Sequence, residues 1–166
     1  MIIQKLNLHI RKLLSKNLGL NLREAEIESR FILEHVLKVN HHYLIKNYSQ
    51  LVEANKLKQI MKCASDRISH KPLAYIFKEW KFYGMEFYIN SNVLIPRQDT
   101  ELLVDLIIEK HDKQKKINIL DLGTGSGVIG IVLGNIFKNA QILLSDISLN
   151  AINIAKKNIL RHKLKN

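Results

Sequence analysis

Residues 117–127 constrain the fold of this chain more than any other stretch. They read Ile-Asn-Ile-Leu-Asp-Leu-Gly-Thr-Gly-Ser-Gly, so a short apolar run leads into three glycines at alternate positions. The apolar run is typical of a buried strand in a parallel sheet. An apolar pattern with helical spacing follows over residues 128–137. Strand, glycine loop and helix in this order open a nucleotide-binding α/β unit, whose loop offers backbone N–H groups and a helix N-terminus to the ligand.

A second apolar run ends in an acidic residue at the distance that such a unit requires. Residues 142–144 are Ile-Leu-Leu, and Asp146 lies 19 residues beyond Gly127. A carboxylate at the tip of the second parallel strand can accept hydrogen bonds from both hydroxyls of a ribose. The spacing therefore predicts an adenosine-type ligand.

The glycine loop alone does not decide which adenosine-type ligand binds. Residues 125–130 also fit the dinucleotide pattern G-x-G-x-x-G, so a nicotinamide-dependent enzyme is the alternative. Asp121 favours S-adenosylmethionine, because a carboxylate beside the loop repels a pyrophosphate and attracts an ammonium and a sulfonium. The pattern Asp-x-Gly-x-Gly-x-Gly is common in methyltransferases. A helix and a polar cluster also precede the first strand, as in many methyltransferases whose N-terminal segment closes over the cofactor.

Residues 1–72 predict a small helical bundle. Apolar residues recur at helical spacing near the N-terminus, again after Asn21, and over residues 52–69. Asn21 and Glu24 have the spacing of an N-cap with its reciprocal acid. Residues 40–50 read as an irregular polar segment, and Pro72 ends or redirects the third helix. We find no catalytic constellation in this region, which suits a docking or lid module rather than a catalytic domain.

Residues 73–92 change character and predict a β-hairpin that connects two domains. Aromatic β-formers flank Gly84, and the expected strands are residues 79–83 and 86–90. A helix over residues 101–110 follows, capped by Asp99 or Thr100. Its predicted inner face consists of Leu102, Leu103, Leu106 and Ile107.

Composition excludes several classes of protein. The net charge of +11 is spread along the chain without a dense basic block, so we expect no direct nucleic-acid binding. No apolar run reaches the roughly 18 residues of a membrane span, and the N-terminus lacks the features of a signal peptide. The single cysteine, Cys63, forms neither an internal disulfide nor a metal site. We therefore expect a cytoplasmic protein without a bound metal.

The order of these parts resembles the family of protein-(glutamine-N5) methyltransferases that modify peptide chain release factors (HemK/PrmC type). Four stretches carry the resemblance, and together they extend over much of the chain. They read Lys-Pro-Leu-Ala-Tyr-Ile at 71–76, Trp-Lys-Phe-Tyr-Gly-Met-Glu-Phe at 80–87, Val-Leu-Ile-Pro-Arg-Gln-Asp-Thr-Glu at 93–101 and Ile-Leu-Asp-Leu-Gly-Thr-Gly-Ser-Gly at 119–127. Gln98 departs from the proline that is usual in the family.

The resemblance implies an α/β fold in three parts: a helical substrate-docking domain (1–72), a hairpin connector (73–92) and the start of a Rossmann-like class I methyltransferase sheet (93–166). It implies methyl transfer from S-adenosyl-L-methionine to the glutamine amide in the Gly-Gly-Gln motif of release factors, which are the expected partners of a monomer. Its implied cofactor-binding residues are Gly123, Thr124, Gly125, Ser126, Gly127 and Asp146, with Thr100 and Glu101 closing over the cofactor.

The largest departure from the family is an absence. In the family an Asn-Pro-Pro-Tyr motif grips the glutamine amide, and this sequence contains only Pro72 and Pro96. Catalytic residues are therefore expected beyond Asn166, and the sheet is expected to be incomplete. We therefore expect the 166 residues to bind the cofactor weakly and not to catalyse the reaction. An alternative is a non-catalytic fragment that binds release factors.

Overall fold

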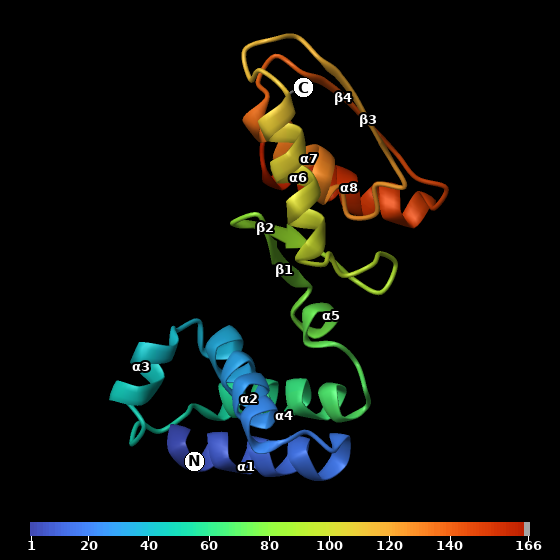
Figure 1. Ribbon diagram of the computed structural model, residues 1–166. Helices are drawn as coiled ribbons and strands as arrows, with labels where there is room; N and C mark the ends of the chain where they lie inside the picture. Colours follow the sequence, from blue (N-terminus) through green and yellow to red (C-terminus); the bar gives the residue numbers. More distant parts are fainter. Residues whose placement is uncertain (165–166) are drawn as a thin grey trace. The chain divides into compact units, whose positions relative to one another are not determined.

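The structure, a computed structural model, describes residues 1–164. The chain divides into two compact units, with the boundary between Phe77 and Lys78 (Figure 1). The first unit is helical, and the second contains a β-hairpin and a two-stranded parallel sheet with helices. The predicted fold class is thus confirmed, including the incomplete sheet. The division into residues 1–72, 73–92 and 93–166 stays a proposal, since the structure groups residues 73–77 with the helical unit.

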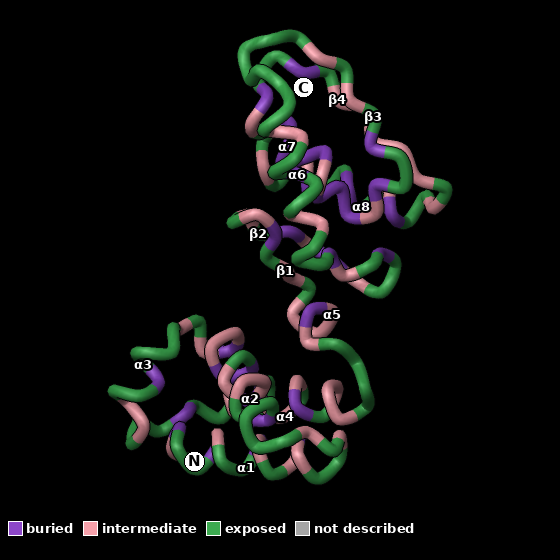
Figure 2. The backbone as a smooth tube through the Cα atoms, in the orientation of Figure 1, coloured by how far each residue is buried: buried purple, intermediate pink, exposed green. Residues whose placement is uncertain are grey.

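Three long helices build the first unit: α1 (Ile3–Leu18), α2 (Leu22–Leu37) and α4 (Ala54–Ile68). Each is amphipathic, and their apolar stripes form one core, seen as purple segments in Figure 2. Leu6, Ile10 and Leu14 of α1 are fully buried there. Half-buried Cys63 packs against the same core, and burial, followed by the charge of Asp66, raises the pKa of its thiol. This cysteine is therefore a packed side chain and not an activated nucleophile.

The start of α2 is encoded as predicted. The Asn21 side chain accepts a hydrogen bond from the Glu24 amide at 2.9 Å, and the Asn21 amide donates to Glu24 Oε2 at 3.0 Å. This reciprocal capping box satisfies two groups that the first turn of a helix leaves unpaired.

Two short helices were not predicted: α3 (His41–Lys46) and α5 (Leu73–Phe77). Elements of six and five residues are too short to show apolar periodicity. Asn40 caps α3 by accepting from the Tyr43 amide at 2.9 Å. Pro72 does not simply stop the chain, because its carbonyl accepts from Tyr75 and Ile76 and so begins α5. Proline is tolerated at a helix start, where its missing N–H would have no partner.

The hairpin consists of β1 (Glu79–Phe82) and β2 (Met85–Tyr88), slightly shorter than predicted. Tyr83 and Gly84 form a two-residue turn with φ of 50° and 72°. Two central residues of positive φ give the turn a twist that matches the strands. Phe82 and Phe87 are buried in the core of the second unit, so the hairpin belongs to that unit.

Helix α6 (Asp99–Lys110) begins two residues earlier than predicted and has no side-chain cap. The predicted inner face is wrong for three of its four residues, because Leu102, Leu103 and Leu106 are exposed. Val104 is buried instead, and Ile107 and Ile108 pack beside it. Both faces of α6 are apolar, so periodicity alone could not select the one that packs.

Strands β3 (Asn118–Leu122) and β4 (Gln141–Ser145) pair in parallel, with Leu122 opposite Ser145. Helices α7 (Val128–Ile136) and α8 (Leu149–Arg161) belong to the same unit, and α7 packs against the inward side chains of both strands. The expectation of a buried strand holds for one face only. On the other face Leu120, Leu122 and Leu143 are 60%, 78% and 66% exposed, because no described residue covers them. No helix in the described chain has the length and apolarity to cross a membrane.

Candidate functional site

The glycine loop connects β3 to α7 at the carboxyl end of the parallel strands. Gly123, Gly125 and Gly127 all have positive φ, at 74°, 55° and 83°. Only glycine adopts this conformation without strain, which explains the alternate spacing of the three residues. The loop therefore turns sharply at each glycine and carries the chain directly into the helix.

Most amides of the loop already have partners inside the protein. The Gly123 and Thr124 amides both donate to the Ser145 carbonyl, at 2.8 and 2.9 Å. The Gly127 amide donates to the Thr124 carbonyl at 2.8 Å. These bonds attach the loop to the end of β4 and fix its conformation. They also leave few N–H groups for an anionic ligand.

Asp121 holds the loop and the helix start together. Its Oδ2 atom accepts from the Thr124 hydroxyl at 2.7 Å and from the Gly130 amide at 3.1 Å. The Gly130 amide lies in the first turn of α7, where N–H groups have no partner within the helix and a negative charge is stabilised. The carboxylate is buried, so its first role is to organise the loop rather than to face a ligand.

Asp146 stands at the tip of β4 with both carboxylate oxygens engaged by backbone amides. Oδ1 accepts from Ser148 at 2.9 Å and Oδ2 from Gly125 at 2.8 Å. These two bonds, the one from Ser148 foremost, lower the pKa of the Asp146 carboxyl below its ordinary 3.8. A carboxylate has about four acceptor positions, so two remain for ligand hydroxyls. Asp146 is thus charged, oriented and connected to the loop.

The predicted cofactor residues differ in how far they are accessible. Gly123 is exposed and Gly125 and Asp146 are half-buried, whereas Thr124, Ser126 and Gly127 are buried. Within residues 1–164 no hydrogen bond ends at the carbonyl oxygens of Gly123 and Gly125. The accessible part of the loop is therefore rich in free acceptors. Ile147, which sequence reasoning missed, is fully exposed beside Asp146 and offers an apolar surface.

Thr100 and Glu101 are not joined to the loop by a hydrogen bond in the described part of the chain. Glu101 Oε1 instead accepts from the Tyr83 amide at 2.6 Å, at the hairpin turn. The Tyr83 hydroxyl donates to Asp105 Oδ1 at 2.7 Å, and this bond raises the pKa of the phenol. Helix α6 thus supports the hairpin turn through two carboxylates, and a cofactor role for Thr100 and Glu101 stays a proposal.

Replacing Glu101 with alanine distinguishes the two roles of this side chain. The observed contact predicts a loss of about 1–2 kcal/mol in the free energy of unfolding, since the Tyr83 amide loses a charged acceptor. It predicts little change in cofactor affinity. Denaturant unfolding and ligand titration of Glu101→Ala and Glu101→Gln would measure both quantities. A large loss of affinity with unchanged stability would favour the cofactor role.

Asn158 is a second residue that sequence reasoning missed. It is fully buried on α8, and its side chain bonds to the backbone of Tyr88 and of Ser126. The signal was present in the sequence, because a polar residue continues the apolar stripe of Ala151, Ile154 and Ala155. A polar side chain at a core position needs partners, and here they lie 70 and 32 residues away.

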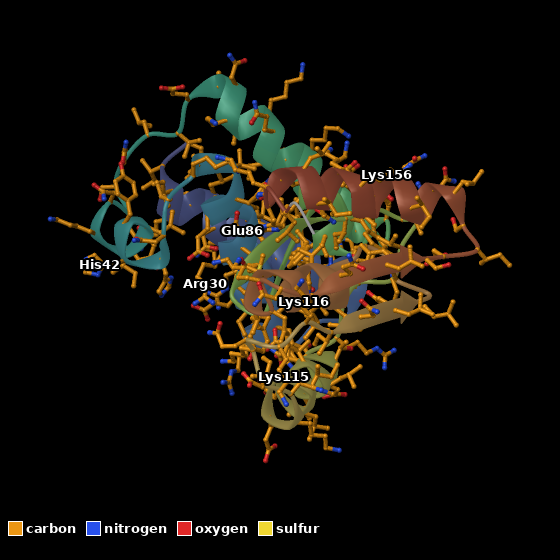
Figure 3. The ribbon with its side chains drawn as sticks, turned by 90° about the horizontal axis from the view of Figure 1, so that it is seen from above. Arg30, His42, Glu86, Lys115, Lys116 and Lys156 are labelled. Atoms are coloured by element: carbon orange, nitrogen blue, oxygen red, sulfur yellow. The ribbon has the colours of Figure 1, made fainter. Side chains whose placement is uncertain are left out.

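The described residues contain no group of three or more His, Cys, Asp or Glu side chains placed to hold a metal ion. Basic side chains come from separate segments. Lys115 and Lys116 precede β3 and Lys156 lies on α8, as labelled in Figure 3. Among the described residues, neither a metal-ligand group nor a cluster of these lysines adds to the candidate site, which consists of the glycine loop, Asp121 and Asp146.

Two protein families match the sequence in the order that the structure suggests. Residues 9–77 match the PrmC N-terminal domain, and residues 98–166 match the methyltransferase small domain. The first match ends where the helical unit ends, and the second contains the glycine loop and Asp146.

Curated relatives carry related names. A release factor glutamine methyltransferase of Clostridium acetobutylicum is 37% identical over 131 residues, covering 79% of this chain and 46% of the relative. One of Fusobacterium nucleatum is 36% identical, covering 84% of this chain and 40% of the relative. A bifunctional methyltransferase of Rickettsia typhi is 40% identical, covering 89% of this chain and 32% of the relative. The chain thus spans between about a third and a half of the length of these relatives.

Proposed function

Because the chain belongs to the HemK/PrmC-type family of methyltransferases, we propose that its second unit binds S-adenosyl-L-methionine at the glycine loop and Asp146. The methionine part would lie against the backbone of Gly123 to Gly127, and Asp146 would accept hydrogen bonds from the ribose hydroxyls. Ile147 would offer an apolar surface to the purine ring beside that carboxylate.

The observation that carries this proposal is the balance of donors and acceptors in the loop. The amides of Gly123, Thr124 and Gly127 are used inside the protein, while the carbonyls of Gly123 and Gly125 accept no hydrogen bond from any described residue. An ammonium group needs acceptors, whereas the pyrophosphate of a dinucleotide needs donors. The loop therefore favours the aminoacyl part of S-adenosylmethionine over a nicotinamide dinucleotide.

For the protein as a whole we propose methylation of the glutamine side-chain amide in the Gly-Gly-Gln motif of peptide chain release factors. The names of the relatives from Clostridium acetobutylicum and Fusobacterium nucleatum support this substrate. The helical unit, which matches the PrmC N-terminal domain, would dock the release factor. We further propose that the protein acts as a monomer in the cytoplasm, where its substrate belongs to the translation machinery.

In the proposed reaction, the main task of the protein is to orient the glutamine amide relative to the cofactor. The cofactor supplies an activated methyl group on a sulfonium, and an amide nitrogen is a poor nucleophile. The enzyme must therefore hold the amide in line with that methyl group and polarise it. Within this chain, Asp121 and Asp146 fix the loop that would hold the cofactor. The sequence contains no Asn-Pro-Pro-Tyr motif, which the family uses to grip the amide.

We accordingly expect the 166-residue chain to bind the cofactor without transferring its methyl group. The chain would be incubated with S-adenosylmethionine labelled in the methyl group and with a release factor. The expected result is no label on the Gly-Gly-Gln peptide, while a relative that carries the Asn-Pro-Pro-Tyr motif labels it under the same conditions. Labelling by the 166-residue chain would contradict the assignment of amide binding to that motif.

Docking is tested separately by retention of a purified release factor on the immobilised chain. The proposal predicts retention that does not depend on S-adenosylmethionine, because the helical unit and the glycine loop belong to different units of the chain. A release factor in which the Gly-Gly-Gln glutamine is replaced is the matched control and should still be retained. Failure to retain either protein would argue against the docking role.

A further inference from the structure

Asn158 lies where three segments of the second unit meet. Its Nδ2 donates to the Tyr88 carbonyl at 2.9 Å and to the Ser126 carbonyl at 2.8 Å, and its Oδ1 accepts from the Tyr88 amide at 2.7 Å. The residue has 0% exposure, so water does not compete for these bonds. One side chain therefore joins α8, the hairpin strand β2 and the glycine loop.

The bond to Ser126 bears directly on the shape of the loop. Ser126 lies between Gly125 and Gly127, the two positions of positive φ that lead into α7. Because the peptide bond is planar, holding the Ser126 carbonyl also orients the Gly127 amide, which donates to the Thr124 carbonyl. Loss of the donor at residue 158 would leave a buried carbonyl without its partner and free this peptide to rotate.

Other contacts attach the hairpin to α8 without reaching the loop. Arg161 Nη2 lies 3.5 Å from Glu79 and 3.2 Å from Glu86, and His162 Nε2 lies 2.9 Å from the Glu86 carbonyl. Glu86 is labelled in Figure 3 and belongs to β2. The Lys157 ammonium lies 3.3 Å from the centre of the Tyr88 ring. The hairpin thus has several attachments to α8. By contrast, within residues 1–164 the side-chain hydrogen bond from α8 to the loop is the one from Asn158 to the Ser126 carbonyl.

We infer that Asn158 is a positioning residue of the cofactor site, acting through the Ser126 carbonyl on the conformation of Gly125 and Gly127. This inference rests on the proposed binding of S-adenosylmethionine. Asn158 itself does not contact the ligand. It fixes the conformation of the loop, in which the Gly123 and Gly125 carbonyls would accept hydrogen bonds from the ammonium group. Because Asn158 also bonds to Tyr88, the loop conformation depends on how β2 packs against α8.

The test uses the full 166-residue chain and S-adenosylhomocysteine as the probe. Asn158→Asp keeps the size and the acceptor for the Tyr88 amide but removes both donors. It should weaken binding about tenfold or more, since a buried carbonyl loses its partner and meets a carboxylate. Asn158→Ala removes the donors without adding charge and serves if the first variant does not fold. Arg161→Gln, which loosens the hairpin but not the loop, is the matched control and should bind within about twofold of the unmodified chain.

A second readout does not need a ligand. The ¹⁵N and ¹H resonances of the Gly127 amide should shift in Asn158→Asp and Asn158→Ala and stay in place in Arg161→Gln. Folded Asn158 variants with unchanged affinity, or an unchanged Gly127 resonance, would overturn the inference. If the unmodified chain does not bind S-adenosylhomocysteine, the proposed function fails, and the Gly127 resonance still decides whether Asn158 sets the loop.

Discussion

Replacing Gly127 with alanine should destabilise the second unit by about 2–4 kcal/mol, more than the same change at the other loop glycines. Two penalties add at this position. An L-residue at φ of 83° costs about 1–2 kcal/mol. An added Cβ would also lie 3.0 Å from Ile131 Cδ1 and 3.2 Å from Ala155 Cβ, which is tighter than most Cβ contacts in folded proteins. Ile131 of α7 and Ala155 of α8 would have to move by a few tenths of an ångström to admit it.

Gly123→Ala is the matched control for this prediction. Gly123 has nearly the same φ, 74°, but a Cβ there would meet nothing within 4 Å. Only the backbone penalty applies, so the loss should be about 1–2 kcal/mol. Trp80 is the single tryptophan and packs against the core of the second unit, so its fluorescence during denaturant unfolding reports on that unit. Equal losses for the two variants would contradict the packing of Gly127 against α8.

Replacing Asp146 with asparagine should weaken binding of S-adenosylhomocysteine by tenfold or more. Each carboxylate oxygen now accepts one backbone amide, from Ser148 and from Gly125. An asparagine must turn its NH₂ group toward one of these amides, which places donor against donor. The substitution also removes the negative charge of the carboxylate that would accept hydrogen bonds from the ribose hydroxyls. Calorimetric titration measures the change, and Asp105→Asn on α6 is a control that leaves the loop untouched.

The same residue predicts how binding depends on pH. Backbone hydrogen bonds lower the pKa of Asp146, so its charged form persists in the folded chain below the ordinary value of 3.8. Its contribution to stability is present at neutral pH and is lost only as the pH falls through the lowered pKa. Affinity should therefore stay constant between about pH 8 and pH 5 as far as Asp146 is concerned. A titration of affinity centred in that range that disappears in Asp146→Asn would contradict the assignment.

Local signals in the sequence were sufficient for the parts of the fold that depend on neighbours in the chain. The strand, the glycine loop and the helix after it were predicted from residues 117–137, and the capping box of Asn21 and Glu24 was predicted from spacing alone. These features are encoded within a few residues because backbone conformation and helix caps are local properties.

Features that depend on distant segments could not be predicted in this way. The packed side of α6 is chosen by the core around Val104, although Leu102, Leu103 and Leu106 were equally suitable by pattern. The partners of Asp121, Thr124 and the Gly130 amide, are only three and nine residues away, but they reach its carboxylate only when the loop folds back over the strand. The partners of Asn158 are separated from it by 70 and 32 residues, so no local sequence pattern predicts them.

The central claim is that the glycine loop and Asp146 bind S-adenosylmethionine rather than a dinucleotide. Parallel calorimetric titrations of the 166-residue chain with S-adenosylhomocysteine and with NAD test it most directly, with Asp146→Asn titrated alongside. The account predicts binding of S-adenosylhomocysteine, no measurable binding of NAD, and loss of affinity in Asp146→Asn. Tighter binding of NAD, or binding of S-adenosylhomocysteine that does not depend on Asp146, would contradict it.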